Sequence, residues 1–430
     1  MTKYFTYIIA VALVCTSCKK DDSEIAPPLT YSRIVDICII GTGRATINWG
    51  DGKSETITLT NPPDFSDIVN YHYLHSYAEY EQPIISIAGN DVVGVHHRSS
   101  ADSIDVSHCP KLKYLSCRVA VDVSRNTALE VLDFGIRVTK GGIKHIDISK
   151  NIALKYLDCE NHQITSLDIS HNIALEYLWC IENQITSLDL SNNIALKELN
   201  CAANSITSLD VSKNYALKVL NFSFNPITSI DVSHNIALEV LSCCAQLTSL
   251  DISKCTTLKQ LICSYSRLTS LDVSKNIAME FLSCKYNQIT SLDVSHNIAL
   301  QRLDCENNPI TSLDLSHNTV LELLYSNNTQ FTSLDVSKCA KLRLLWCSNN
   351  QITSLDVTYN TLMENLYCEG NNLDAAALNA LFDTLPDRNV HTPWGMISLG
   401  EIHVKGNPGI TQDGYDSTLA TRKRWGVYEN

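Results

Sequence analysis

Apolar residues alternate with polar or aromatic residues in short segments through the middle of the chain. Residues 175–183 have the sequence L-E-Y-L-W-C-I-E-N, and residues 185–193 have the sequence I-T-S-L-D-L-S-N-N. In a strand, such alternation turns Leu178 and Cys180 to one face and Tyr177 and Trp179 to the other. Both segments end in an Asn. The pattern therefore predicts two short extended segments, each followed by a bend.

From Asp147 to Asp356 the pair of segments recurs with a period of 21 residues, shortened once to 20, and the two steps before Asp147, of 17 and 25 residues, together equal two periods. An Asp marks each unit: Asp105, Asp122, Asp147, Asp168, Asp189, Asp210, Asp231, Asp251, Asp272, Asp293, Asp314, Asp335 and Asp356. Thirteen units share the consensus L-x-x-L-x-C-x-x-N-x-I-T-S-L-D-V-S-x-N-x-A. Because one unit cannot bury its apolar edge alone, we expect neighbouring units to stack into a solenoid.

This consensus resembles the leucine-rich repeat, in the bacterial form of 21 residues with Cys at the sixth position. The resemblance covers roughly residues 104–373 and implies a protein of a kind that often binds partners. We expect a β-rich solenoid of about 13 flat coils with strands on both faces and little curvature. Stacked at about 4.8 Å per coil, it would form a rod of roughly 60 Å.

The sixth position of the repeat predicts a ladder of buried thiols. Phe134, Phe222 and Ser326 replace Cys there, and exchange with Phe indicates an interior position. Stacked thiols are too far apart for disulfides and do not converge on a metal, so we expect no cofactor and no metal site. The ladder cysteines are Cys117, Cys159, Cys180, Cys201, Cys243, Cys263, Cys284, Cys305, Cys347 and Cys368.

Columns of polar residues that recur from coil to coil are expected at the bends. Asn183 and Asn193 represent two columns whose side-chain amides can satisfy backbone groups left unpaired by the strands. Cys109, Cys255 and Cys339 replace this Asn and should weaken the bend. We expect the Asp column to accept hydrogen bonds from Ser, Thr or backbone N–H groups, with a row of bound cations as the alternative.

One face of the predicted solenoid is uniform, and the other varies from coil to coil. The variable face carries large aromatic and acidic residues, which suit the binding of a protein or a sugar. We therefore name two groups of candidate ligand-binding residues. The first group is Tyr156, Asp158, Glu160, Tyr177, Trp179 and Glu182, and the second is Arg302, Asp304, Glu306, Tyr325, Trp346, Tyr367 and Glu369.

Composition narrows the class of partner. The chain has 430 residues, 44% hydrophobic and 18% charged, which indicates a folded protein. Its net charge of −13 disfavours nucleic acid. The carboxyl pairs Asp158/Glu160 and Asp304/Glu306 make a glycoside-active enzyme a remote alternative, because an open strand offers no pocket that would separate their pKa values.

The N-terminus predicts an export signal. Lys3 precedes an apolar run over residues 4–14, too short to span a membrane. Cys15-Thr16-Ser17-Cys18 and the following Lys-Lys-Asp-Asp resemble a lipoprotein signal that is cleaved before Cys18, with lipid on its sulfur, and exported to the outer face of a Gram-negative outer membrane. The alternative is a cleaved secretory signal without lipid.

Non-repeating segments flank the solenoid. Alternating runs around residues 34–40, 45–49 and 84–88 predict strands. Trp49-Gly50-Asp51-Gly52 with His75-Ser76-Tyr77 resembles the polycystic-kidney-disease-type β-sandwich. After residue 373, helical spacing up to Pro386, a strand near 401–404 and a short helix near 417–423 predict an α/β cap. The expected divisions are a signal peptide (1–17), a tether (18–30), a β domain capping the solenoid (31–100), the solenoid (101–373) and a C-terminal cap (374–430).

These features favour a lipid-anchored surface protein that binds another protein through its repeat face. Binding of a glycan, as in polysaccharide capture, is the first alternative.

Overall fold

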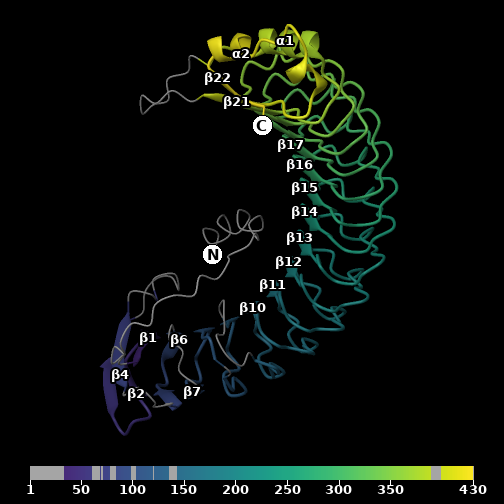
Figure 1. Ribbon diagram of the computed structural model, residues 1–430. Coiled ribbons are helices and arrows are strands. Elements are labelled where there is room, and N and C mark those ends of the chain that lie inside the picture. The colour runs from purple at the N-terminus through teal and green to yellow at the C-terminus, as the bar shows by residue number, and fades with distance from the viewer. Residues whose placement is uncertain are drawn as a thin grey trace.

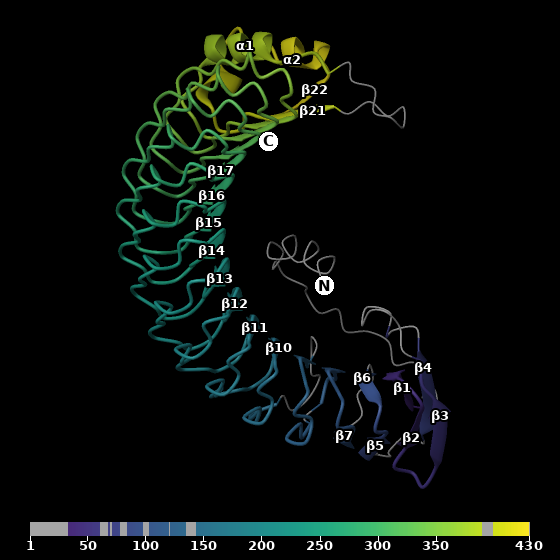
Figure 2. The same cartoon turned by 180° about the vertical axis from the view of Figure 1, so that it is seen from behind.

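The chain winds into an open arc with short strands along its inner, concave side (Figure 1, and from behind in Figure 2). The computed structural model describes residues 33–60, 68, 71–77, 84–97, 103–119, 121–134, 143–388 and 399–429. Residues 1–30, for which the sequence predicts a signal peptide, a lipid-bearing Cys18 and a tether, lie outside these described residues. Among the described residues, no helix is long and apolar enough to cross a membrane.

Thirteen three-residue strands form the centre of the arc. They are β8 Tyr114–Ser116, β9 Val131–Asp133, β10 Tyr156–Asp158, β11 Tyr177–Trp179, β12 Glu198–Asn200, β13 Val219–Asn221, β14 Val240–Ser242, β15 Gln260–Ile262, β16 Phe281–Ser283, β17 Arg302–Asp304, β18 Leu323–Tyr325, β19 Leu344–Trp346 and β20 Asn365–Tyr367. Consecutive strands pair in parallel, in unbroken register. The predicted β-rich repeat solenoid is confirmed.

The coils differ from the prediction in having strands on one face only. Residues 185–190, expected to be the second strand of their coil, form no strand. A recurring backbone hydrogen bond on that side joins the N–H of Gln184 to the carbonyl of Ile164 at 2.9 Å. Beyond it, packed side chains such as Leu188 and Leu190 separate the coils. Because these side chains need more room than the β spacing of about 4.8 Å, the stack bends towards its strands and is curved, not flat.

Buried thiols fill the interior as predicted. The ladder cysteines are at most 1% exposed and unpaired. Burial raises the pKa of Cys201 and Cys347 to about 12, so these side chains remain neutral thiols and pack as small apolar groups.

Asparagine side chains join neighbouring coils at both bends. The amide of Asn183 donates to the carbonyls of Cys159 at 2.8 Å and Cys180 at 3.1 Å, and its oxygen accepts from the N–H of Ile164 at 3.0 Å. In the other column, Asn172 donates to the carbonyl of Asn151 at 2.9 Å. The predicted ladders are confirmed.

The side chains of the Asp column accept hydrogen bonds from Ser residues two positions later in the same coil, as expected. The carboxylate of Asp189 accepts from the N–H of Ser191 at 2.9 Å, and hydrogen bonds from the Ser191 backbone and side chain lower the pKa of Asp189. The same arrangement recurs from Asp147 to Asp335.

A left-handed residue follows each strand of the regular coils. In each of these coils, the residue just before the position equivalent to Asn183 has φ between 52° and 63° whatever its type, because the chain must turn sharply there. These residues are Asn161, Glu182, Ala203, Phe224, Tyr265, Tyr286, Asn307, Asn328, Asn349 and Gly370. Only Gly and, to a lesser degree, Asn adopt this conformation at little cost.

The N-terminal strands run directly into the solenoid sheet. They are β1 Arg33–Gly41, β2 Arg44–Asn48, β3 Ser54–Thr58, β4 His72–Tyr77, β5 Ile84–Ala88, β6 Val92–His97 and β7 Ser103–His108. β1 pairs antiparallel with β4 and β6, and β6 pairs in parallel with β8. β2, β3, β5 and β7 form the second sheet.

Trp49 lies inside this sandwich, 2% exposed. Its ring stacks on His75 with centroids 4.8 Å apart, and its carbonyl accepts from the hydroxyl of Tyr77 at 2.6 Å. Gly50 has φ +82°, and a Cβ there would lie 2.6 Å from the carbonyl oxygen of Ile84. The motif therefore forms a tight surface turn beside a buried Trp49, while the family resemblance of this segment stays a prediction.

The C-terminal segment extends the same sheet. Its elements are α1 Ala375–Thr384, β21 Gly400–His403, the 3₁₀ turn η3 Pro408–Thr411, α2 Thr418–Arg422 and β22 Trp425–Tyr428. β21 pairs in parallel with β20, and β22 with β21. One apolar core runs unbroken from Val35 to Trp425.

Candidate binding surface on the concave strands

Parallel register arranges the outward side chains of the coil strands into two rows along the concave face. The middle residue of each strand is a buried Leu, so the first and last residues point outward. We call these the first-residue row and the last-residue row. Both vary from coil to coil, and both continue beyond β20, where Asn365 pairs with Glu401 and Tyr367 with His403.

The first candidate group lies on β10 and β11 and the turns that follow. Tyr156 stands beside Tyr177 in register, and its ring contacts Trp179 edge to face at 5.5 Å. The indole N–H of Trp179 donates to Glu198 on β12 at 3.0 Å. The structure thus brings the predicted aromatic residues together and adds Glu198 as a support.

Acidic side chains surround these rings. Asp158 is 6% exposed, and burial, with smaller effects of Asp133 and Glu160, raises its pKa to about 8. Burial likewise raises the pKa of Glu160 and of Glu198. Glu182 occupies one of the left-handed turn positions. The first group therefore offers an aromatic surface bordered by carboxyl groups whose ionised forms are disfavoured by burial and by one another.

The second candidate group forms a longer aromatic series on β17–β20. The guanidinium of Arg302 lies 4.8 Å from the ring centroid of Phe281 and 4.9 Å from that of Tyr325. The ring of Trp346 lies edge to face against Tyr325 at 5.4 Å and against Tyr367 at 4.9 Å. These five side chains cover adjacent strands without a gap.

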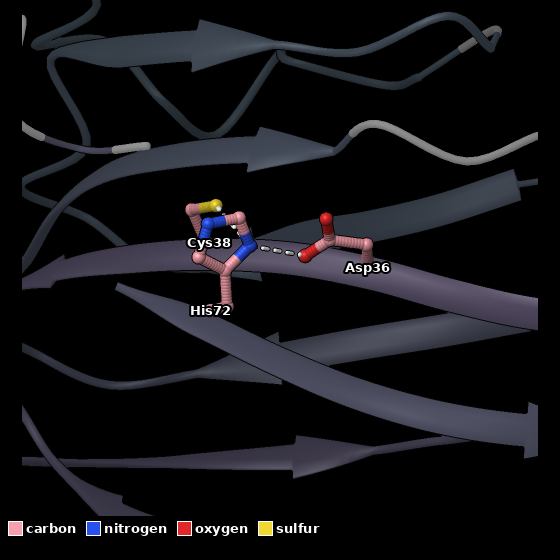
Figure 3. Close-up of side chains that lie close together, drawn as sticks. All are labelled: Asp36, Cys38 and His72. Carbon is pink, nitrogen blue, oxygen red and sulfur yellow. Dashed lines mark hydrogen bonds and ion pairs between the residues drawn. The ribbon is translucent and has the colours of Figure 1, made fainter. Parts of the chain in front are cut away.

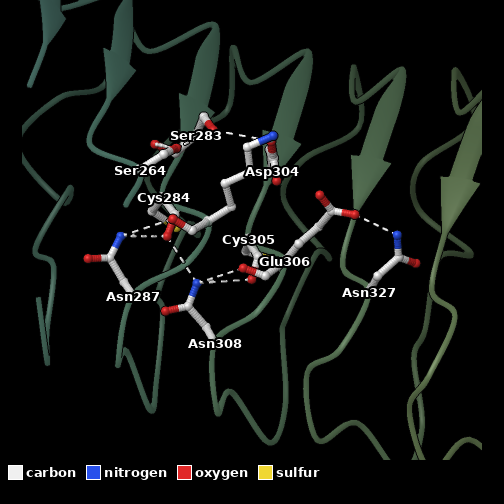
Figure 4. Close-up of polar contacts among 10 residues, drawn as sticks. Ser264, Ser283, Cys284, Asn287, Asp304, Cys305, Glu306, Asn308 and Asn327 are labelled. Carbon is white, nitrogen blue, oxygen red and sulfur yellow. Dashed lines mark hydrogen bonds and ion pairs between the residues drawn. The ribbon is translucent and has the colours of Figure 1, made fainter. Parts of the chain in front are cut away.

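Three acids of the second group, Asp304, Glu306 and Glu369, form hydrogen bonds or ion pairs with other side chains of the chain. Asp304 is 2% exposed, and its carboxylate accepts from Ser283 at 3.2 Å and pairs with Lys285 at 3.3 Å (Figure 4). Glu306 accepts from the side-chain amide of Asn327. Glu369 accepts from the hydroxyl of Ser348 at 2.9 Å. These contacts orient the acids beneath and beside the rings.

The two groups share the concave face but do not form one site. Six strand positions separate β11 from β17, about 29 Å at the β spacing. The last-residue row between them carries smaller side chains: Asn200, Asn221, Ser242, Ile262 and Ser283. A ligand that touched both groups would have to span this stretch.

Sequence reasoning missed His403 and Tyr428, which prolong the aromatic series. His403 stacks on Tyr367 at 4.4 Å and on Tyr428 at 4.3 Å. Both residues lie outside the repeat, so only the pairing of β20, β21 and β22 reveals their place. A second unpredicted feature is a column of Ile residues that directly follow the Asn column represented by Asn193. Their side chains are about 60% exposed in each case: Ile152, Ile173, Ile194, Ile236, Ile277 and Ile298.

Comparison with solved structures shows the family. The functional domain of InlJ from Listeria monocytogenes, which includes a cysteine ladder, is 30% identical in sequence; the match covers 70% of each chain with a TM-score of 0.58. This chain belongs to the leucine-rich repeat proteins. A leucine-rich repeat protein of Leptospira interrogans shares the fold at 20% identity, with a TM-score of 0.60 over 66% of this chain and 82% of that one.

The fold is also similar to that of the plant peptide hormone receptor RGFR1, solved in complex with RGF2. The identity is 16%, and the TM-score is 0.53 over 76% of this chain and 62% of that chain. No protein-family model and no curated protein sequence matches this chain.

Proposed function

We propose that this protein is a cell-surface binding protein whose concave strands recognise another protein. The observation that carries the proposal is the aromatic series from Tyr325 to Tyr428, which lines one end of the concave face. Large, half-exposed aromatic side chains held in fixed orientations are the residues that most often dominate protein interfaces.

The rigidity of the surface supports this proposal. Tyr325, Trp346 and Tyr367 each directly follow a buried Leu in their strand, and their rings pack against rings of neighbouring strands. Little side-chain entropy is therefore lost on binding, which favours affinity. A fold of the same kind binds a peptide hormone in the plant receptor.

Glycan binding is the second candidate. Tyr325, Trp346 and Tyr367 offer ring faces and edges, and Glu369 lies beside them as an acceptor for hydroxyl groups. A glycoside-active enzyme is not proposed. Such an enzyme needs a pocket that separates the pKa values of two carboxyl groups, and Asp158 and Glu160 lie at the end of β10 and in the turn that follows it on the open concave face.

The proposed location is the outer face of a Gram-negative outer membrane, with lipid on Cys18. The residues that support this are the apolar run after Lys3 and the Ser17-Cys18 junction. Labelling of cells with a palmitate analogue, compared between wild type and Cys18→Ala, tests the anchor. Protease treatment of intact cells tests exposure. If wild type carries no label, the lipid anchor is rejected and a cleaved secretory signal without lipid becomes the preferred interpretation.

A binding screen tests the main proposal. The purified protein is presented to host-matrix proteins and, in parallel, to a glycan array. Binding to a protein that is lost in Trp346→Ala supports the proposal, and binding only to glycans supports the second candidate. If neither Trp179→Ala nor Trp346→Ala changes any binding detected, the concave face is not the site.

A further inference from the structure

A separate group of polar side chains lies on the N-terminal sheet, at the other end of the arc from the aromatic series. Asp36 and Cys38 lie two residues apart on β1 and therefore share one face of the sheet. His72 on β4 is the cross-strand partner of Cys38. One donor atom from each of the three residues falls within 4.8 Å of the other two.

The imidazole of His72 lies at the centre of the group (Figure 3). Its Nδ1 is 2.8 Å from Oδ1 of Asp36 and 3.7 Å from Sγ of Cys38. Figure 3 shows both side chains directed towards the ring from the same strand. We propose that Asp36, Cys38 and His72 bind one Zn²⁺ ion through Oδ, Sγ and Nδ1.

The spacing suits a small tetrahedral ion. With Zn–S near 2.3 Å and Zn–N and Zn–O near 2.1 Å, neighbouring ligand atoms of a tetrahedral site lie about 3.4–3.6 Å apart. The Sγ–Nδ1 distance of 3.7 Å exceeds this range by only about 0.1 Å. The Oδ1–Nδ1 distance of 2.8 Å must open by about 0.6 Å, a movement that rotation of the Asp36 carboxyl group supplies.

The mixture of donor types selects the metal. A thiolate and an imidazole favour Zn²⁺ over Mg²⁺ and Ca²⁺, which take oxygen ligands. Binding replaces the proton of the Cys38 thiol, which passes to solvent, while neutral His72 offers the lone pair of Nδ1 with its proton on Nε2, so affinity rises with pH. The charges of the thiolate and the Asp36 carboxylate balance that of the ion.

The site is reachable and rigid. Cys38 is fully buried, whereas the side chains of Asp36 and His72 are 23% and 37% exposed. An ion can therefore enter from solvent and meet the sulfur at the base of the site. Three protein ligands leave a fourth position for water. The backbone is fixed by six consecutive residue pairs between β1 and β4.

This site could not be predicted from the sequence, because its three ligands do not follow the spacing of any known metal-binding motif. Asp36 and Cys38 precede His72 by more than thirty residues, and only antiparallel pairing of β1 with β4 brings them together. The ladder cysteines differ, because they have other ladder residues as neighbours on adjacent coils. Without an ion, the same three side chains form an Asp–His hydrogen bond beside a buried thiol.

Metal analysis of the untagged full-length protein, purified in detergent and stripped with a chelator, tests the proposal. Equilibrium dialysis against Zn²⁺ should give one bound equivalent per chain. Co²⁺ should give a thiolate-to-metal absorption band. Cys38→Ser should abolish that band, and Asp36→Asn and His72→Gln should each weaken Zn²⁺ binding at least tenfold. His171→Gln and Cys244→Ser, which alter a turn histidine and a half-buried thiol elsewhere, should bind as wild type.

The proposal is overturned if wild type binds no equivalent, or if all three ligand variants bind Zn²⁺ as wild type does. Thermal melting of the metal-free variants shows whether each is folded. Asp36→Asn changes only a partly exposed oxygen, so it decides the matter if Cys38→Ser does not fold. Zn²⁺ should raise the melting temperature of wild type and leave that of Asp36→Asn almost unchanged.

Discussion

Tyr367, in the last repeat coil, stacks on His403, which comes from the segment after the repeats. The ring centroids are 4.4 Å apart and the rings are inclined by 23°. The contact exists because β21 continues the parallel sheet at the register of β20. The aromatic surface of the repeats is thereby extended by a part of the chain that has no repeat.

Removing the centre of this series should weaken binding of the protein partner. Trp346→Ala deletes a ring that contacts both Tyr325 and Tyr367, and we expect affinity to fall about 30-fold, as for an interface hot spot. His403→Ala should have a smaller effect. Titration of the partner by calorimetry measures both. Tyr215→Ala, which removes an exposed ring from the outer bend, is the control and should bind normally.

The thiol ladder should resist alkylation in the native protein. Burial raises the pKa of Cys201 and Cys284 to about 12, so at pH 8 the reactive thiolate is scarce and shielded. Cys244, which is only half-buried, should react first. Mass spectrometry after timed iodoacetamide treatment measures this, with urea-unfolded protein as the control. Native ladder thiols that react as fast as Cys244 would contradict the fold.

Asp158 should make the protein less stable as pH rises. Burial raises its pKa to about 8, above the value of about 3.9 in the unfolded chain, so the folded state holds the proton more tightly. Its contribution to stability is therefore complete below about pH 4 and is lost as pH rises to 8. Relative to wild type, Asp158→Asn should gain up to about 5 kcal/mol of unfolding free energy between pH 4 and pH 8.5, measured by urea unfolding.

Asp189 provides a control with the opposite sign. Hydrogen bonds from the backbone and side chain of Ser191 lower its pKa, so its contribution is present above the unfolded pKa and is lost as pH falls. The difference between wild type and Asp189→Asn should shrink on acidification. Parallel pH profiles for the two variants would show that Asp158 is not held as the structure describes.

Loss of a ladder amide should destabilise the solenoid. Asn297 is fully buried and donates to the carbonyls of Val273 at 3.0 Å and Asn276 at 2.9 Å. Asn297→Ala removes both of these hydrogen bonds, although each carbonyl still accepts a backbone N–H from Asn276 or Met279, and should cost about 1–2 kcal/mol of unfolding free energy. Asn297→Cys should cost less, because Cys255 in the same column still donates to the carbonyl of Val232 at 3.6 Å. Equal losses for Ala and Cys would contradict this.

Phe224 should be replaceable with a gain in stability. It is 68% exposed and holds φ at 59°, a conformation that is unfavourable for an aromatic residue. Asn occupies the equivalent position in other coils, and Phe224→Asn should add about 0.5–1 kcal/mol. The converse control is Gly370→Ala, since a Cβ there would meet Oδ1 of Asn349 at 2.5 Å. Chemical unfolding of both variants should give shifts of opposite sign.

The repeat could be predicted closely because it is a local pattern. Alternation and the 21-residue period place Leu178, Cys180 and Asn183 correctly, since each has the same neighbours in every coil. The strands near residues 34–40 and 84–88 and the helix before Pro386 also lie close to their predicted bounds. The candidate ligand-binding residues stay predictions, although the structure places all thirteen on or beside the concave strands.

The sequence by itself determined the coil, its buried thiols and its Asn ladders, because a repeat of fixed length repeats its contacts. Tertiary structure alone decided the curvature. The coils are closer together on the side where their strands form backbone hydrogen bonds than on the opposite side, where packed side chains separate them. Tertiary structure also decided the junctions at both ends. The stacking of His403 on Tyr367 and the meeting of Asp36, Cys38 and His72 arise from strand pairing between residues more than thirty positions apart, which no local pattern encodes.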